Sequence, residues 1–168
     1  PGRLAPLAGL YPGYFALVMA TGIVALALDR LGAFWLARLL SWLDVAAYAT
    51  LSVLLLARFV LFGRQALADL LDHVRGPGYF TWVAGTCVLG SQLLLLHGAV
   101  TPAWLLWLVG AALWLGVTYT FFVAVTLRRK KPPIGDAISG AWLLAVVATQ
   151  AVALLGAQLV QHGGQGGA

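Results

Sequence analysis

The sequence predicts an all-α, polytopic membrane protein, and three observations lead to that fold class. Hydrophobic residues make up 62% of the chain and charged residues only 9%, against about 25% charged residues in ordinary globular proteins. Five continuous apolar runs reach the length of about 20 residues that a helix needs to cross a bilayer. The third observation is an internal repeat whose period fits a helical hairpin. Because the runs do not alternate in polarity, they are typical of helices and not of a transmembrane β-barrel.

The repeat begins near the start of the chain. Residues 12–22 read PGYFALVMATG, and residues 77–87, at an offset of 65 residues, read PGYFTWVAGTC without a gap. A looser third copy begins at Gly140, and with one residue inserted its Thr149 aligns with Thr21 and Thr86. A period of 65 residues holds two membrane spans and their connections, so the repeating unit is a hairpin of two helices.

Each predicted span is an apolar run with few or no charges. We place the five spans near residues 10–28, 42–62, 79–97, 103–127 and 141–161. They form a single transmembrane domain over residues 1–168, with hairpins near 10–62 and 77–127 and half a hairpin at 140–162. Two and a half hairpins, in a chain that begins with Pro1, indicate a piece of a longer polypeptide.

The distribution of basic residues predicts the orientation in the membrane. One side receives the N-terminus and the second and fourth loops, with eight basic residues: Arg3, Arg58, Arg64, Arg75, Arg128, Arg129, Lys130 and Lys131. The other side receives only Arg30 and Arg38. We therefore expect a cytoplasmic N-terminus in a plasma (inner) membrane. The net charge of +5 fits contact with anionic lipid, and we expect no nucleic-acid partner.

The second loop is expected to contain a short amphipathic helix at the cytoplasmic surface. Its apolar residues recur at helical spacing, while charged residues fill the other face. The apolar set is Leu67, Leu70, Leu71 and Val74, and the charged set is Arg64, Asp69, Asp72 and Arg75. A break at Gly76-Pro77-Gly78 then turns the chain into the third span.

The odd-numbered spans carry small or polar residues near mid-membrane, whereas the even-numbered spans are mostly Leu, Val, Trp and Phe there. The polar set is Thr21, Gly22, Gly85, Thr86, Ser91, Gln92, Thr149 and Gln150. Polar side chains at this depth face protein or a water-filled path. We predict that the odd spans line a path and that the even spans, at positions such as Phe121, face lipid or an outer neighbour. For the three threonines, packing between helices is the stronger alternative.

Signatures of an enzyme are missing from the sequence. The acidic residues fall in loops or at span ends, so no mid-membrane group favours proton coupling, and His73, His97 and His162 lack metal-ligand spacing. Asp44 and Arg58, near opposite ends of the second span, are expected to extend toward opposite membrane surfaces. His97 and His162 both end outward-going spans, which leaves a pair of haem ligands as an alternative to two unrelated interfacial histidines. We expect no cofactor and no metal.

Three stretches resemble, in order, the first, third and fifth helices of the tellurite-resistance/dicarboxylate transporter family. They are PGYFALVMATGI at 12–23, GYFTWVAGTCVLGS at 78–91 and GAWLLAVVATQ at 140–150. The family also includes malate and sulfite permeases and the slow anion channels of plant guard cells. The resemblance implies ten helices in five hairpins, with the odd helices around a central pore in each subunit of a homotrimer. The gating phenylalanine of the family lies on the ninth helix, so no residue of this chain inherits that role.

The resemblance and the polar odd spans predict transmembrane transport of a small anion, such as a dicarboxylate, sulfite or an inorganic anion, through a pore in the lipid bilayer. The residues do not separate a channel from a coupled carrier. Two other classes stay open, a membrane-embedded electron carrier or enzyme subunit that uses the outer histidines, and a scaffold segment without transport activity.

Overall fold

The structure is a computed structural model that describes residues 5–127 and 140–165. Helices account for the elements in these ranges: α1 (Ala5–Ala8), η1 (Pro12–Phe15), α2 (Ala16–Arg30), α3 (Phe34–Leu70), η2 (Gly76–Gly78), α4 (Tyr79–His97), α5 (Val100–Leu127), η3 (Gly140–Leu143) and α7 (Leu144–Gln165). Five stretches are long and apolar enough to cross a membrane, namely Pro12–Arg30, Phe34–Leu70, Gly76–His97, Val100–Leu127 and Gly140–Gly163. The predicted all-α membrane fold with five spans is therefore confirmed.

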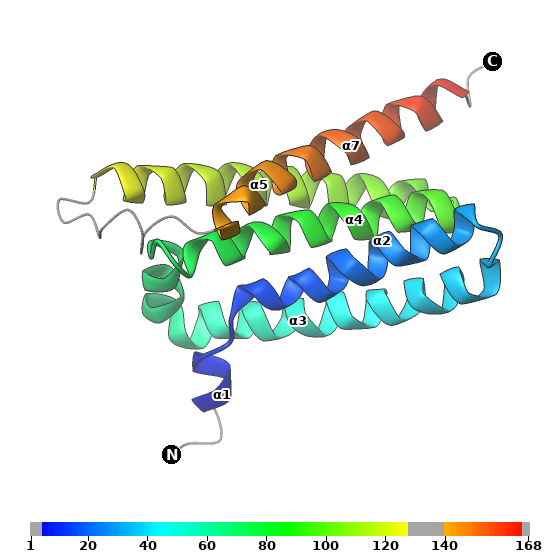
Figure 1. Ribbon diagram of the computed structural model, residues 1–168. Helices are drawn as coiled ribbons and strands as arrows, with labels where there is room; N and C mark the ends of the chain where they lie inside the picture. The colour runs from blue at the N-terminus through cyan, green and yellow to red at the C-terminus, as the bar shows by residue number, and fades with distance from the viewer. Residues whose placement is uncertain (1–4, 128–139, 166–168) are drawn as a thin grey trace.

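Helix α4 is the central element of the bundle (Figure 1). It packs against α2 and α3 on one side and against α5 and α7 on the other. Fourteen of its 19 residues are buried, while the neighbouring helices turn large apolar faces outward, for example at Leu17, Val60 and Tyr119. Such an exposed apolar surface is stable only in contact with lipid or further protein. Consecutive long helices run antiparallel, as hairpins do.

Each copy of the repeat begins in the same local structure. A 3₁₀ turn, η1, η2 or η3, precedes α2, α4 and α7 respectively. In the first two copies a proline occupies the first turn, where its missing N–H costs no hydrogen bond. The ring of Tyr11 fills the space beside both turns, and a Cβ atom on Gly13 or Gly78 would come within 2.2 Å or 2.8 Å of that ring. Close packing on the Tyr11 ring thus explains why each of these two turns has a glycine after its proline.

The second span differs in extent from the prediction. Helix α3 begins at Phe34, about two turns before the expected start at residue 42, and it continues to Leu70 across a break at Phe62, whose backbone is non-helical (φ −129°, ψ 35°). The stretch after Phe62 corresponds to the predicted amphipathic helix, but it ends at Leu70 and does not reach Arg75. The chain turns there because the Asp72 carboxylate accepts the backbone N–H groups of Val74 (2.9 Å) and Arg75 (3.0 Å).

The expectation that Asp44 and Arg58 extend to the membrane surfaces was wrong. Each residue is only 1% exposed, and each has a polar partner inside the bundle. Asp44 accepts a hydrogen bond from Gln92 of α4, and Arg58 pairs with Asp69. The sequence alone does not reveal those partners, because they come from other turns and other helices.

The prediction that Phe121, on an even-numbered span, faces outward was wrong. Its side chain is 1% exposed. The ring stands edge-on to Phe80 of α4, at 5.8 Å between centroids, and to Trp142 of η3, at 5.1 Å. Since α5 packs along α4, one face of this apolar helix is buried although its composition is hydrophobic all round.

Candidate functional site

A cavity of about 310 Å³ lies between the three odd-numbered spans. Helices α2, α4 and α7 each contribute to its wall, which is lined by Met19, Ile23, Leu26, Ala84, Cys87, Val88, Ser91, Val147, Gln150, Ala151, Leu154 and Gln158. No lining residue carries a formal charge. Its polar side chains are one hydroxyl and two amides, from Ser91, Gln150 and Gln158, so the cavity is an apolar hollow with a few neutral hydrogen-bonding groups.

Two of the eight residues predicted to line a path, Ser91 and Gln150, line this cavity. Gln158 joins them although the prediction did not include it. It follows Gln150 by two helical turns and therefore lies on the same face of α7. Its Oε1 atom is buried without a hydrogen-bond partner within the described residues. The i, i+8 spacing of the two glutamines is the sequence signal that would have identified it.

The aligned threonines of the second and third copies hold neighbouring helices together. Thr86 donates to the Trp82 carbonyl (2.7 Å), and its Oγ1 lies 2.9 Å from the Tyr48 hydroxyl of α3. Thr149 likewise donates to the Ala145 carbonyl (2.8 Å) and accepts the Trp114 indole N–H of α5 (2.9 Å). In both copies an aromatic residue on the preceding even helix contacts the threonine, which fits the packing alternative. Thr21 is half-buried.

The remaining candidates, Gly22, Gly85 and Gln92, lie at the contact between helices. Gly85 is buried, and a Cβ atom there would be in ordinary contact with Phe15, at 3.5 Å. Gly22 allows a closer approach, because a Cβ atom would come within 2.5 Å of both Gln92 Nε2 and Val88 Cγ1. Val88 itself lines the cavity, so this contact lies directly behind the cavity wall.

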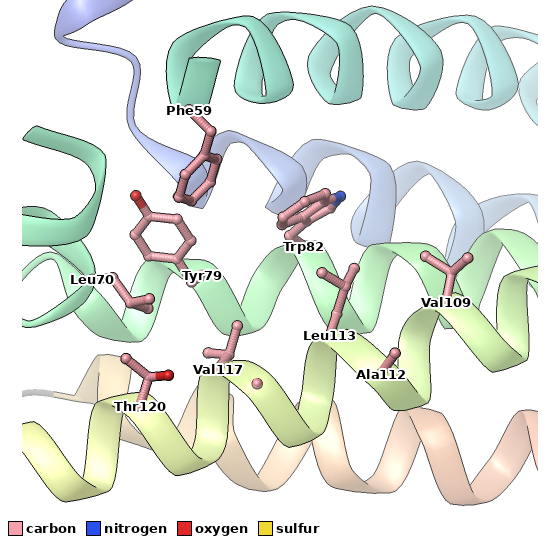
Figure 2. A pocket seen from close by; sticks show the side chains of 10 residues that line it. Phe59, Leu70, Tyr79, Trp82, Val109, Ala112, Leu113, Val117 and Thr120 are labelled. Atoms are coloured by element: carbon pink, nitrogen blue, oxygen red, sulfur yellow. The ribbon is translucent and has the colours of Figure 1, made fainter. Parts of the chain in front are cut away.

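A second hollow, of about 480 Å³, opens between α3, α4 and α5, and none of its lining residues lines the first (Figure 2). Phe59, Leu70 and Tyr79 surround one end of it, while Trp82 and Val109 lie toward the other. Aliphatic and aromatic side chains form nearly all of its wall. This composition suits contact with lipid chains better than passage of a polar solute.

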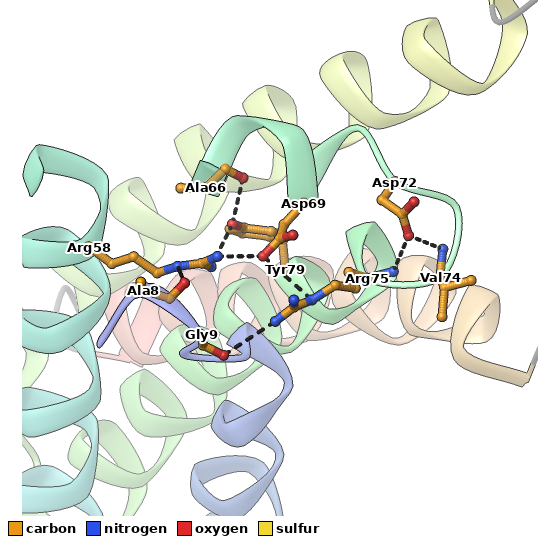
Figure 3. A network of polar contacts seen from close by, with 9 residues as sticks. All are labelled: Ala8, Gly9, Arg58, Ala66, Asp69, Asp72, Val74, Arg75 and Tyr79. Atoms are coloured by element: carbon orange, nitrogen blue, oxygen red, sulfur yellow. Dashed lines mark hydrogen bonds and ion pairs between the residues drawn. The ribbon is translucent and has the colours of Figure 1, made fainter. Parts of the chain in front are cut away.

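A buried arginine cluster fixes the end of the bundle where the first span begins (Figure 3). Arg58 forms an ion pair with Asp69, donates through Nε to the Ala8 carbonyl (3.0 Å) and lies 3.5 Å from the Tyr79 hydroxyl. Arg75 lies 3.4 Å from the same Asp69 carboxylate and donates to the Gly9 carbonyl (3.3 Å). The cluster joins the N-terminal segment, the end of α3 and the start of α4.

His97 contacts α3 rather than His162, the partner considered in the sequence analysis. Its Nε2 is 3.1 Å from Ser41 Oγ of α3, and its ring packs on Trp42. Within residues 5–127 and 140–165, no group of three His, Cys, Asp or Glu side chains could hold a metal ion.

The sequence matches a known protein-family model over nearly its whole length. The model described as "SLAC1: Voltage-dependent anion channel" matches residues 9–168. The chain belongs to this family. The match confirms the resemblance found in the sequence, and the family is one of transport proteins and not of enzymes.

Among curated proteins, the chain is similar to the sulfite efflux pump SSU1 of Arthroderma otae, with 26% identity over 161 residues. The alignment covers 89% of this chain and 42% of the pump, so the chain spans about two fifths of the length of that relative. No solved structure matches the chain.

Proposed function

We propose that this member of the voltage-dependent anion channel family moves small anions across a membrane, along a path on the shared face of α2, α4 and α7. The observation that carries the proposal is the cavity between the three odd-numbered spans, with Ser91, Gln150 and Gln158 in its wall. These helices are the ones that the internal repeat marks as equivalent. The earlier candidates Thr21, Gly22, Gly85, Thr86, Gln92 and Thr149 then support the wall from behind or beside it.

Neutral donors are suited to this task. An anion that leaves water needs hydrogen-bond donors, and the amide N–H groups of Gln150 and Gln158 and the Ser91 hydroxyl can supply them. Without a fixed positive charge in the lining, a passing anion is held weakly enough to leave again. Conduction requires that balance between entry and release.

Sulfite is the first substrate to test, because the relative from Arthroderma otae is described as a sulfite efflux pump. Dicarboxylates and inorganic anions are the other members of the proposed class. We further propose a homotrimer in the plasma membrane with the N-terminus in the cytoplasm. These proposals rest on the resemblance and on the distribution of basic residues.

The test is anion flux in liposomes that contain the purified full-length protein. Gln150→Leu and Gln158→Leu should each slow sulfite flux by about tenfold or more, because loss of one hydrogen bond to a charged group costs roughly 1.5–3 kcal/mol. Gln161→Leu is the matched control, since it makes the same change on the exposed surface of α7 away from the cavity. If all three variants transport like the unmodified protein, the path does not follow this cavity.

A further inference from the structure

Asp44 and Gln92 form a buried pair whose hydrogen bonding is incomplete. The Gln92 amide Nε2 donates to Asp44 Oδ2 at 2.5 Å. The two residues are 1% and 0% exposed, and they connect α3 to α4. The other oxygen of each side chain, Asp44 Oδ1 and Gln92 Oε1, is buried without a hydrogen-bond partner among the described residues. Buried polar atoms are almost always paired, so two orphaned oxygens in one contact need an explanation.

Both orphaned atoms are acceptors as long as the carboxyl group is ionised. An ionised aspartate has no hydrogen to donate, whereas a protonated aspartate has one O–H group. A carboxylic acid and a primary amide can pair through two hydrogen bonds, N–H to the acid carbonyl and O–H to the amide carbonyl. The first of these bonds is present. The orphaned Oδ1 and Oε1 atoms are the acid and amide oxygens that such a second bond would join, and one proton on Oδ1 would then satisfy both.

The two orphaned atoms are shielded from solvent, and the pair is closely packed on its α2 side. A Cβ atom on Gly22 would lie 2.5 Å from Gln92 Nε2 and 3.2 Å from Asp44 Oδ2. The α2 side of the pair therefore has no room even for a methyl group, and a water molecule or a hydrated cation cannot enter from there.

The charged and titratable groups nearby do not neutralise Asp44. Within the described residues its contacts include no ion pair, since both ion pairs there involve Asp69. The Asp44 carboxyl faces the neutral amide of Gln92 on α4 and the backbone at Gly22 on α2. His97 reaches the same stretch of α3 through Ser41, one turn from Asp44, while Asp29 and Arg30 lie at the end of α2. An ionised carboxylate buried without a cation is far costlier than a neutral acid.

We propose that Asp44 and Gln92 form a proton-binding site that joins α2, α3 and α4 directly behind the wall of the cavity. Release of the proton from Oδ1 to water leaves the carboxylate charged and breaks the second hydrogen bond. The carboxylate must then gain water, which requires the close contact at Gly22 to open. Val88 takes part in that contact and also lines the cavity, and Ser91 precedes Gln92 in the chain. Proton binding is thereby linked to the shape of the cavity.

Infrared spectroscopy of the purified full-length protein in lipid nanodiscs tests the site without any transport assay. At mildly acidic pH the unmodified protein should show the carbonyl band of a protonated carboxylic acid, shifted by deuterium exchange. Asp44→Asn should remove that band, and its amide preserves an isosteric pair with Gln92. Gln92→Leu should move the band to higher frequency because the acid loses its hydrogen bonds. Asp29→Asn, at the end of α2, is the matched control and should leave the band in place.

The absence of an acid band, or its persistence in Asp44→Asn, would overturn the proposal. A thermal stability that rises with sodium concentration only when Asp44 is present would also overturn it, in favour of a cation site. A second measurement rests on the proposed function: flux through the unmodified protein should vary with pH, and Asp44→Asn should lose that variation. An acid band in a protein without anion flux would support the proton site and contradict the proposed function, so the two failures are distinguishable.

Discussion

Gly22 illustrates how one residue without a side chain sets the spacing of three helices. It lies in the first copy of the repeat, in a stretch of α2 that touches α4, and the nearest atoms belong to Gln92, Val88 and Asp44. Small residues at such positions allow the close approach on which helix packing in membranes depends. The role of Gly22 is therefore steric, and a larger residue would push α2 away from the polar pair.

Gly22→Ala should destabilise the protein by about 1–3 kcal/mol, the usual cost of adding a methyl group to a filled interior. The change is measured as a lower midpoint of thermal unfolding in detergent. Gly116→Ala in α5 is the control, because a Cβ atom there has no neighbour within 4 Å and alanine favours the helix. Equal midpoints for the two variants would contradict the packing role of Gly22.

At the scale of elements, the break at Phe62 decides how the end of the bundle is closed. Arg58 and Asp69 are 11 residues apart, which in a straight helix would separate them by about 16 Å along the axis. Because α3 changes direction at Phe62, the two side chains meet and form an ion pair (Figure 3). The same pair then holds the Ala8 carbonyl and the Tyr79 hydroxyl, so one break positions three separate segments.

Asp69→Asn should lower the stability by about 3–5 kcal/mol, since it leaves the Arg58 guanidinium buried without a countercharge. Thermal unfolding in detergent measures the loss, and proteolysis of the N-terminal segment should become faster because Arg58 also holds Ala8. Arg75→Gln is the control. Arg75 is 40% exposed, and surface ion pairs contribute at most about 1 kcal/mol. A larger effect from Arg75→Gln than from Asp69→Asn would show that the exposed arginine is the main partner.

At the scale of the whole molecule, the distribution of basic residues predicts one orientation in the membrane. Two exposed residues at opposite ends of the bundle can test this orientation. They are Gln65, after the break in α3, and Thr101, at the start of α5. The single native cysteine, Cys87, is buried and contributes little background in labelling experiments.

In intact cells, a cysteine introduced by Thr101→Cys should react with a membrane-impermeant maleimide, because the predicted topology places this end of α5 outside. A cysteine introduced by Gln65→Cys should react only after the membrane is permeabilised. The reverse pattern would invert the predicted topology while leaving the helix assignments unchanged.

The properties that depend on local chemistry can be read from the amino-acid sequence. Apolar runs longer than a bilayer require helices, so the five spans and the fold class follow from composition. The turn into the third span at Gly76-Pro77-Gly78 follows from the local preferences of proline and glycine, and the ordered motifs indicate the family. The i, i+8 spacing of Gln150 and Gln158 on α7 is also a readable signal for the cavity, although the predicted path includes only Gln150.

Which polar side chains meet depends on how the helices pack. Asp44 and Gln92 are 48 residues apart, and Tyr48 and Thr86 are 38 apart, so no local pattern connects them. Phe121 is buried for the same reason, since α4 covers one face of a helix that is apolar on every side. In a membrane, an apolar side chain is about equally stable against lipid and against protein. Hydrophobicity therefore does not distinguish lipid-facing positions from buried ones. Contacts between helices make that choice, and they exist only once the chain has folded.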